Sequence, residues 1–441
     1  MTPPPGPPVQ TPLADPPQFY PSKAQAWWLL AVLFAGGLIS YMHRLVLGVL
    51  VQPLSHDLAL SDTQVSLLQG AAFAAIYVIA GLPLGRLADR GRRRVMVVVG
   101  SIVWSVGTLL CGLSPSFIWL FGARCVVGLG EATLAPAAAS MIADAFKPHE
   151  RGTALGIFLT GIVLGGPTAI WFGGYVLTLA DTGALTYWPV IGQLPGWRLV
   201  LVILALASLL FPLAMLGVRE PLRRERPSLE QFELSGALRT WKLLMPLLLG
   251  IALLSVGDYG ILSWAPTALI RAFSWPANRV GAAVGLVTAV AGVTGALLGG
   301  VLADAAARRA GELARLTVTA TAAVFGLAGA LMIMAPHPLV VLAGVGLWML
   351  SSSIGATSGI SVLQSLVPPG LRGTGMSLVA FCNTLLGLGL GPTAVALTSD
   401  AYGGRMGTSW AITTVVGPAA TLSAILLATV RRSRSAKSHS A

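Results

Sequence analysis

Long apolar runs separated by short polar segments make up the chain from about residue 27 to residue 430. A helix needs about 20 mostly apolar residues to cross a bilayer, so each run predicts one membrane-spanning helix. The predicted spans are 27–50, 65–86, 95–113, 117–143, 153–178, 198–217, 243–270, 280–303, 315–335, 338–364, 373–398 and 408–430. The pattern therefore predicts an all-α integral membrane protein with 12 transmembrane helices.

Polar segments divide these spans into two groups of six. Residues 1–25 contain nine prolines and no apolar core, which predicts a disordered tail. The charged segment 218–242 is expected to link an N-terminal six-helix bundle, 26–217, to a C-terminal one, 243–430. A basic tail, 431–441, follows the last span.

The composition favours the same class. Of 441 residues, 55% are hydrophobic and only 10% are charged, whereas soluble domains carry about 25% charged residues. A soluble enzyme or a free nucleic-acid-binding protein is thereby largely excluded. The cysteines lie in apolar runs without C-x-x-C or metal-ligand spacing, so no disulfide, metal or cofactor is expected.

The net charge of +12 indicates topology rather than nucleic-acid binding. With both termini placed in the cytoplasm, the inner segments hold 22 Lys and Arg residues and the outer loops hold 4. This asymmetry follows the positive-inside rule and predicts that both termini are cytoplasmic.

The two groups of spans resemble each other in sequence. GRLADRGRRR at 85–94 and GVLADAAARR at 300–309 share Gly, Leu, Ala, Asp and two Arg at a constant offset. Each half also contains RGT followed by GPTA. Parallel repeats of this kind are typical of transporters whose pathway lies between two six-helix bundles.

At these residues the chain resembles the major facilitator superfamily, from about residue 27 to residue 430. GLPLGRLADRGRRR resembles motif A of that superfamily, RCVVGLGEA its helix-4 motif, and GIVLGGPTAIWFGG its helix-5 antiporter motif. Within the superfamily, WSVGTLLCG, GEATLAPAAASMIADAF and VREP resemble bacterial-type members of the Spinster-like group. Related anion:cation symporters also carry an R…GxGEA helix 4.

Few ionisable residues lie inside the predicted spans: His43, Arg44, Arg124, Glu131 and Asp258. Such residues are costly in a membrane unless they face a cavity or a partner, so they are candidates for function. We predict Arg44 and Arg124 as anion anchors, and His43 and Glu131 as titratable groups. Arg124 and Glu131 are seven residues apart, so they share one helix face about 10 Å apart along the axis.

A glutamate beside an arginine has two stable states, ionised and paired, or protonated while the arginine binds something else. The Spinster resemblance implies a helix-1 Asp-Arg pair and a helix-4 Glu that takes part in protonation. Here His43 stands where that Asp is expected, so proton coupling through helix 1 is an open question.

Structural alternatives remain open for each candidate. Arg124 and Glu131 could form a purely structural ion pair. His43 could be a core histidine that is hydrogen-bonded to a backbone carbonyl. Asp258 and Tyr259 either line the cavity or simply lie near a helix break at Gly257 and Gly260.

A second set of residues flanks the inner loops. We predict that these residues form a cytoplasmic gate that pairs across the two halves and opens when they rock, although some of the arginines also suit contacts with anionic lipid. The predicted gate residues are Gly85, Asp89, Arg90, Arg93, Asp144, Arg151, Glu220, Asp304, Arg308 and Arg372.

The predicted function is secondary active transport by alternating access, coupled to protons, of a small organic or amphipathic solute that is lipid-like or anionic. The alternatives are an uncoupled facilitator of the same fold and an organic-anion symporter. No Walker A motif is present to use ATP directly, and the scattered histidines suggest no enzyme active site. We expect a monomer in the bacterial inner membrane, surrounded by lipid, with protons as the co-substrate and no nucleic acid.

Overall fold

The computed structural model describes residues 20–147, 150–188, 191–223, 234–367 and 372–438. In this part of the chain, 12 helical stretches are long and apolar enough to cross a membrane, which confirms the predicted fold class. Much of the predicted tail at 1–25 and of the linker at 218–242 lies outside the described residues. Of the parts that are described, α1 begins at Lys23 and α11 begins at Leu234.

The N-terminal half holds ten helices and one short 3-10 turn, Ile191–Gln193. Four of its six spans are broken into two helices each. The helices are α1 (Lys23–Leu45), α2 (Leu47–Leu58), α3 (Asp62–Gln69), α4 (Ala71–Arg90), α5 (Arg93–Gly112), α6 (Phe117–Glu131), α7 (Leu134–Ala145), α8 (Arg151–Asp181), α9 (Gly196–Ser208) and α10 (Leu210–Leu216).

The C-terminal half has longer, less broken helices and a 3-10 turn at Glu312–Ala314. A π-helical segment, Asn383–Leu388, joins α15 to α16 inside one span. The helices are α11 (Leu234–Phe273), α12 (Ala277–Ala310), α13 (Arg315–Met332), α14 (Pro338–Leu366), α15 (Arg372–Cys382), α16 (Gly389–Tyr402) and α17 (Gly407–Ser438).

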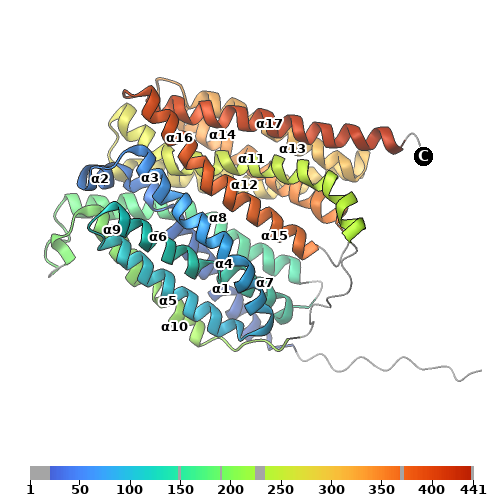
Figure 1. The fold of residues 1–441 in the computed structure, drawn as a ribbon, viewed down its shortest axis with the longest axis horizontal. Helices are drawn as coiled ribbons and strands as arrows, with labels where there is room; N and C mark the ends of the chain where they lie inside the picture. The colour runs from blue at the N-terminus through green and yellow to red at the C-terminus, as the bar shows by residue number, and fades with distance from the viewer. Residues whose placement is uncertain (1–19, 148–149, 189–190, 224–233, 368–371, 439–441) are drawn as a thin grey trace, which may run out of the picture.

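The two halves lie side by side with their helices running along a common direction (Figure 1). We call the end where α1 begins and α17 ends the terminal end, and the other end, where α2 and α3 lie, the opposite end. The halves meet mainly where α8 packs against α12, α2 against α11, and α3 against α16. A site between the halves is therefore bounded by helices of both repeats.

Capping residues explain where two of the N-terminal helices begin. Ser22 before α1 and Ser61 before α3 each accept a hydrogen bond from the backbone N–H three residues on, and Gln25 and Gln64 return one to the cap. This reciprocal arrangement satisfies two backbone donors that a helix start otherwise leaves unpaired. The second cap places Asp62 in the first turn of α3, at the opposite end.

Candidate functional site

A buried ion pair joins α1 to α6. Arg44 Nη2 lies 3.1 Å from Glu131 Oε2, and the side chains are 4% and 0% exposed. Ser40, one turn before Arg44, donates its hydroxyl to the same carboxylate oxygen at 2.8 Å. Removing two charges from water is tolerated only where they are paired and hydrogen-bonded, which is the case here. The sequence analysis had singled out both charges, and the tertiary structure pairs them.

Aromatic rings surround the same arginine. The guanidinium carbon of Arg44 lies 4.4 Å from the ring centre of Tyr41, 4.6 Å from that of Phe73 and 4.9 Å from that of Tyr77. A cation over aromatic faces gains about 0.5–2 kcal/mol per contact. Tyr259 of α11 interacts with both Tyr41 and Arg44, so the C-terminal half also reaches the pair.

The pair does not use all its hydrogen-bonding capacity. Within the described residues, Glu131 Oε1 and Arg44 Nε are buried without a hydrogen-bond partner. Buried polar atoms are nearly always hydrogen-bonded, so such exceptions need an explanation. The free carboxylate oxygen of Glu131 could accept a proton, and the free N–H of Arg44 could donate a hydrogen bond to an anion.

Arg124 binds backbone rather than a side chain. Its Nε donates to Leu68 O at 2.9 Å and its Nη1 to His43 O at 2.9 Å. Its Nη2 contacts Arg44 O at 3.4 Å and Gln69 O at 3.5 Å. These carbonyls belong to the last turns of α1 and α3, where helix breaks leave acceptors without an intrahelical donor. Arg124 therefore stabilises two broken helices at once.

This arrangement shows which groups the candidate residues of helices 1 and 4 contact. Glu131 has Arg44 as its ion-pair partner, since the donors of Arg124 are committed to carbonyls. His43 faces the interior of the N-terminal half, where its Nδ1 lies 2.7 Å from Thr108 Oγ1 on α5. Its Nε2 is buried without a partner among the described residues.

Asp258 lies inside the C-terminal half, half-buried on α11. Its Oδ1 accepts a hydrogen bond from Trp348 Nε1 of α14 at 2.9 Å. A Cβ on the preceding residue, Gly257, would collide with the Trp348 ring, so this glycine lets the indole reach Asp258. No signal in the sequence points to this contact, since nothing in the chain pairs positions 258 and 348.

At the terminal end, Arg93 of the N-terminal half is the centre of a network. It donates to Ser140 at 2.9 Å and to Asp144, both on α7. Its backbone N–H and Nε donate to Glu220 Oε1 at 2.9 and 3.3 Å. The structure thus brings together three predicted gate residues, two from the N-terminal half and Glu220 from the start of the predicted linker.

In the C-terminal half, a predicted gate residue also pairs within its own half. Asp304 accepts from Arg315 Nη2 at 3.1 Å, and both belong to that half. A Cβ on Gly85 would meet no atom within 4 Å. The other gate residues lie at this end too: Arg90 ends α4, Arg151 begins α8 and Arg308 is near the end of α12, while the side chains of Asp89 and Arg372 are outside the described part.

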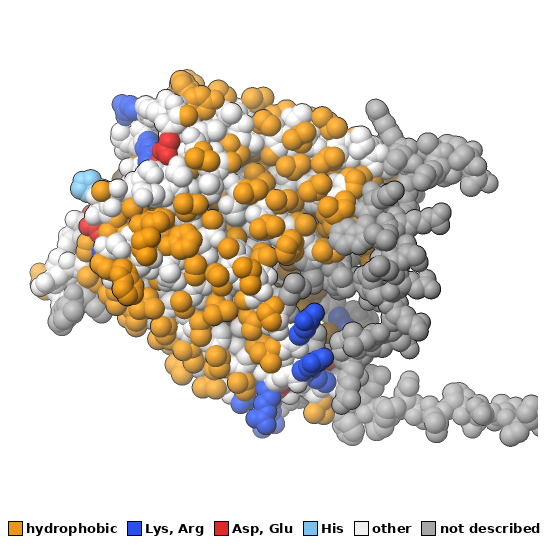
Figure 2. Space-filling view, in the orientation of Figure 1, with side chains coloured by type: hydrophobic (Ala, Val, Ile, Leu, Met, Phe, Trp, Pro, Cys, Tyr) orange, Lys and Arg blue, Asp and Glu red, His pale blue; other side chains and the backbone are white. Residues whose placement is uncertain are grey.

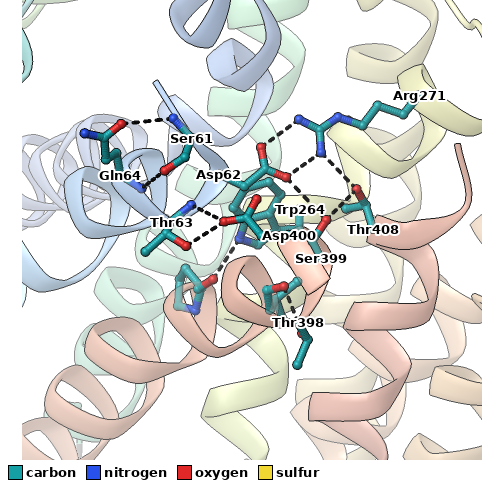
Figure 3. A network of polar contacts seen from close by, with 12 residues as sticks. Ser61, Asp62, Thr63, Gln64, Trp264, Arg271, Thr398, Ser399, Asp400 and Thr408 are labelled. Atoms are coloured by element: carbon teal, nitrogen blue, oxygen red, sulfur yellow. Dashed lines mark hydrogen bonds and ion pairs between the residues drawn. The ribbon is translucent and has the colours of Figure 1, made fainter. Parts of the chain in front are cut away.

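Among the described residues, an ion pair and several hydrogen bonds cross between the halves at the opposite end (Figure 3). Asp62 of α3 forms a bidentate ion pair with Arg271 of α11, at 2.5 and 2.7 Å. Thr408 of α17 accepts from Arg271 at 3.2 Å, and Ser399 of α16 donates to Asp62 at 3.3 Å. We call this set the Asp62–Arg271 network.

A second polar contact extends this network. The backbone N–H and hydroxyl of Thr63 donate to Asp400 Oδ2 at 3.3 and 2.7 Å. In the sequence, Arg271 is one of the four basic residues of the predicted outer loops, and no pattern there gives Asp62 or Asp400 a role. These residues are visible in the sequence only as charges near the ends of predicted spans. That signal does not show which of them pair, because the partners lie hundreds of positions apart.

Close backbone packing accompanies the network. A Cβ on Gly174 of α8 would lie 2.5 Å from the Ala277 carbonyl of α12, and one on Gly70 would collide with the Leu388 carbonyl. On the terminal-end part of α8, a Cβ on Gly156 would meet nothing within 4 Å. The halves are therefore tightly closed at the opposite end, and this part of α8 is not packed in the same way.

Comparison with known proteins agrees with this architecture. The model of the Major Facilitator Superfamily matches residues 33–392. An MFS-type efflux pump of Mycolicibacterium smegmatis is 30% identical over 392 residues, 87% of this chain and 86% of that protein. A sphingosine-1-phosphate transporter of Danio rerio is 26% identical over 84% of this chain and 75% of its own length.

A solved structure is similar over almost the whole chain. It is a bacterial homologue of the human lysosomal transporter Spinster in an inward-facing and occupied conformation. The TM-score is 0.78 at 26% identity, covering 93% of this chain and 96% of that one.

Proposed function

Because this chain belongs to the major facilitator superfamily and is a transporter of the Spinster-like type, we propose that it moves an amphipathic or anionic solute in a proton-coupled manner. The observation that carries the proposal is the buried Arg44–Glu131 pair. It is a charge pair at the meeting point of both halves, with an unpartnered oxygen and an unpartnered donor among the described residues.

The coupling step is an exchange of partners. When Glu131 takes a proton on its free oxygen, its attraction for Arg44 falls, and the guanidinium becomes available to a substrate anion. Breaking a buried pair without replacement costs about 3–5 kcal/mol, so the protonated state favours an occupied site. When the anion leaves, the carboxylate loses its proton and pairs with Arg44 again.

The surroundings of Arg44 favour a solute with an apolar part. Tyr41 and Tyr77 are half-buried beside the guanidinium, and Tyr259 adds an aromatic side chain from the other half. A few polar groups in an aromatic and aliphatic wall suit an anionic head on an apolar body. Asp258 is a second carboxylate in the C-terminal half that is available for protonation.

We place the protein in the inner membrane of a bacterial cell. The distribution of Lys and Arg supports an orientation in which the terminal end faces the cytoplasm. With that orientation, the Asp62–Arg271 network closes the outer side, and the structure corresponds to an inward-facing state. Transport would then require this network to break while the terminal end closes. The gate residues at the terminal end would exchange partners between the halves in that second state.

The test is transport by purified protein in liposomes loaded with a pH-sensitive dye, with sphingosine-1-phosphate as the probe. We expect an imposed pH gradient to drive uptake, addition of the probe to move protons, and a protonophore to abolish gradient-driven uptake. Glu131→Gln should lose pH-driven uptake while still exchanging probe across the membrane. The matched control is Glu312→Gln, which removes an exposed carboxylate of the C-terminal half.

Two results would contradict proton coupling. Uptake that follows only the probe gradient, with or without protonophore, would identify an uncoupled facilitator. Equal pH-driven uptake by wild type and Glu131→Gln would place the proton elsewhere. If the probe is not carried, a thermal-shift screen of lipids, drugs and organic acids provides the next probe, because a ligand that prefers one state raises Tm.

A further inference from the structure

A groove of about 430 Å³ opens on the outer surface of the N-terminal half, and neither Arg44 nor Glu131 lines it. It lies between α4 and α5, with α6 as its floor. Its walls are apolar apart from Thr133 and one charged residue, Arg92. The hydroxyl of Thr133 is already bonded to Gly130 O at 2.8 Å, so the groove offers an apolar channel with one cation.

The packing of three helices creates this groove. α6 packs closely against both neighbours: a Cβ on Gly130 would lie 2.5 Å from Gly100 O of α5, and one on Gly128 would lie 2.7 Å from Phe73 O of α4. In contrast, α4 and α5 barely touch each other. A gap therefore remains between them along the surface that a bilayer would cover.

The side chains at the edges of the groove face outward. Leu87 on α4, and Val95 and Val99 on α5, are each about half exposed. In a membrane protein such positions face lipid tails. An occupant of the groove therefore comes from the bilayer rather than from water.

Basic side chains surround the terminal end of the groove. Arg92 precedes α5, and Arg86 and Arg90 are exposed on the last turns of α4, four residues apart. Arg223 crosses this turn and donates to Ala88 O at 2.5 Å. Figure 2 shows Lys and Arg side chains gathered where the broad hydrophobic face reaches this end.

Two of the acidic side chains that the structure describes beside this cluster already have a basic partner. Glu220 and Asp144 are both engaged by the buried Arg93. The exposed guanidinium groups of Arg86, Arg90 and Arg92 therefore leave net positive charge at the mouth of an apolar channel. Basic clusters at this depth attract anionic lipid headgroups, each residue contributing about 1 kcal/mol.

We propose that this groove binds an anionic phospholipid, with one acyl chain between α4 and α5 and the phosphate on Arg92. The site is separate from the substrate site, and the proposal does not depend on proton coupling. It touches the coupling helix, because Leu129 and Gly130 line the groove directly before Glu131. An acyl chain there restrains the part of α6 that carries the carboxylate.

The test is native mass spectrometry of the delipidated full-length protein titrated with phosphatidylglycerol or phosphatidylcholine. We expect wild type to retain phosphatidylglycerol at least fivefold more tightly. Arg92→Gln should reduce that preference about fivefold, the effect of one basic residue. Val99→Trp should fill the groove and weaken both lipids. Arg279→Gln, which changes an exposed arginine at the opposite end, is the matched control.

Equal binding of the two lipids, or equal losses for Arg92→Gln and Arg279→Gln, would overturn the proposal. So would unchanged binding in Val99→Trp. Because Val99 is about half exposed, the tryptophan is expected to leave the fold intact, and thermal unfolding without added lipid checks this. If Val99→Trp lowers the thermal unfolding temperature, Val95→Trp on the same wall of the groove replaces it.

Discussion

Individual buried side chains in this protein pair with charges and donate hydrogen bonds to backbone carbonyls that would otherwise have no partner inside a membrane. Arg44 and Glu131 neutralise each other across α1 and α6. Arg124 satisfies carbonyls left open by two helix breaks. Both arginines are conspicuous in the sequence for the same reason, the cost of a charge inside a span. Their roles differ because one meets a carboxylate and the other meets backbone.

We therefore predict that Arg124→Ala destabilises the protein more than it changes coupling. Two strong hydrogen bonds to buried carbonyls disappear, and each unsatisfied group costs about 1–3 kcal/mol. Tm in detergent should fall clearly, while protein that remains folded should keep its response to a pH gradient. Arg309→Ala, at an exposed position on α12, should leave Tm unchanged. Loss of coupling at unchanged Tm would assign Arg124 to the binding site instead.

Three membrane spans are interrupted at positions where the two halves meet. The breaks between α1 and α2 and between α3 and α4, and the π-helical segment before α16, all lie beside the other half. π-Helical turns are rare and are often found at functional sites. The opposite-end pieces α2 and α3 are short elements, and α3 is held across the interface by the Asp62–Arg271 network.

We predict that Asp62→Asn weakens closure at the opposite end. An interfacial charge pair that loses one partner costs about 2–5 kcal/mol when buried and less when partly exposed, as here. Labelling of Thr267→Cys, a buried position on α11, by a membrane-impermeant maleimide should become at least several-fold faster.

The control for this experiment is Asp57→Asn. Asp57 also pairs with an arginine, Arg198 at 3.4 Å, but within the N-terminal half. Its loss should leave labelling of Thr267→Cys unchanged. Equal acceleration in both variants would mean that the Asp62–Arg271 network has no special part in closure.

At the scale of the whole molecule, two repeated halves meet closely at one end and place their basic residues at the other. The count of 22 basic residues against 4 predicts that the terminal end is cytoplasmic. The tertiary structure adds that the inter-half network lies at the end with few basic residues. The closed side is therefore predicted to be the periplasmic one.

Reporter fusions test this orientation. Alkaline phosphatase inserted after Tyr187, which is 90% exposed at the opposite end, should be active because it folds only in the periplasm. A fluorescent protein fused after Ala441 should be bright because that end is predicted to be cytoplasmic. A dark fluorescent fusion at the C-terminus, with no phosphatase activity at position 187, would reverse the predicted orientation.

The sequence alone determined the fold class, the number of spans and their division into two related halves. Each of these follows from local composition: run length sets a span, and the match of GRLADRGRRR to GVLADAAARR marks the repeat. It also identified the charges of the Arg44–Glu131 pair, because a charge in an apolar run is visible without any structure.

Only the tertiary structure decided which groups meet. Spacing along α6 placed Arg124 and Glu131 on one face, but the carboxylate pairs with Arg44 of α1, 87 positions away. The Asp62–Arg271 contact joins residues 209 positions apart. Such pairs depend on how two bundles pack and on which side is closed, and a single chain carries no local signal of either. The sequence located the charges; the packing of the two halves chose their partners.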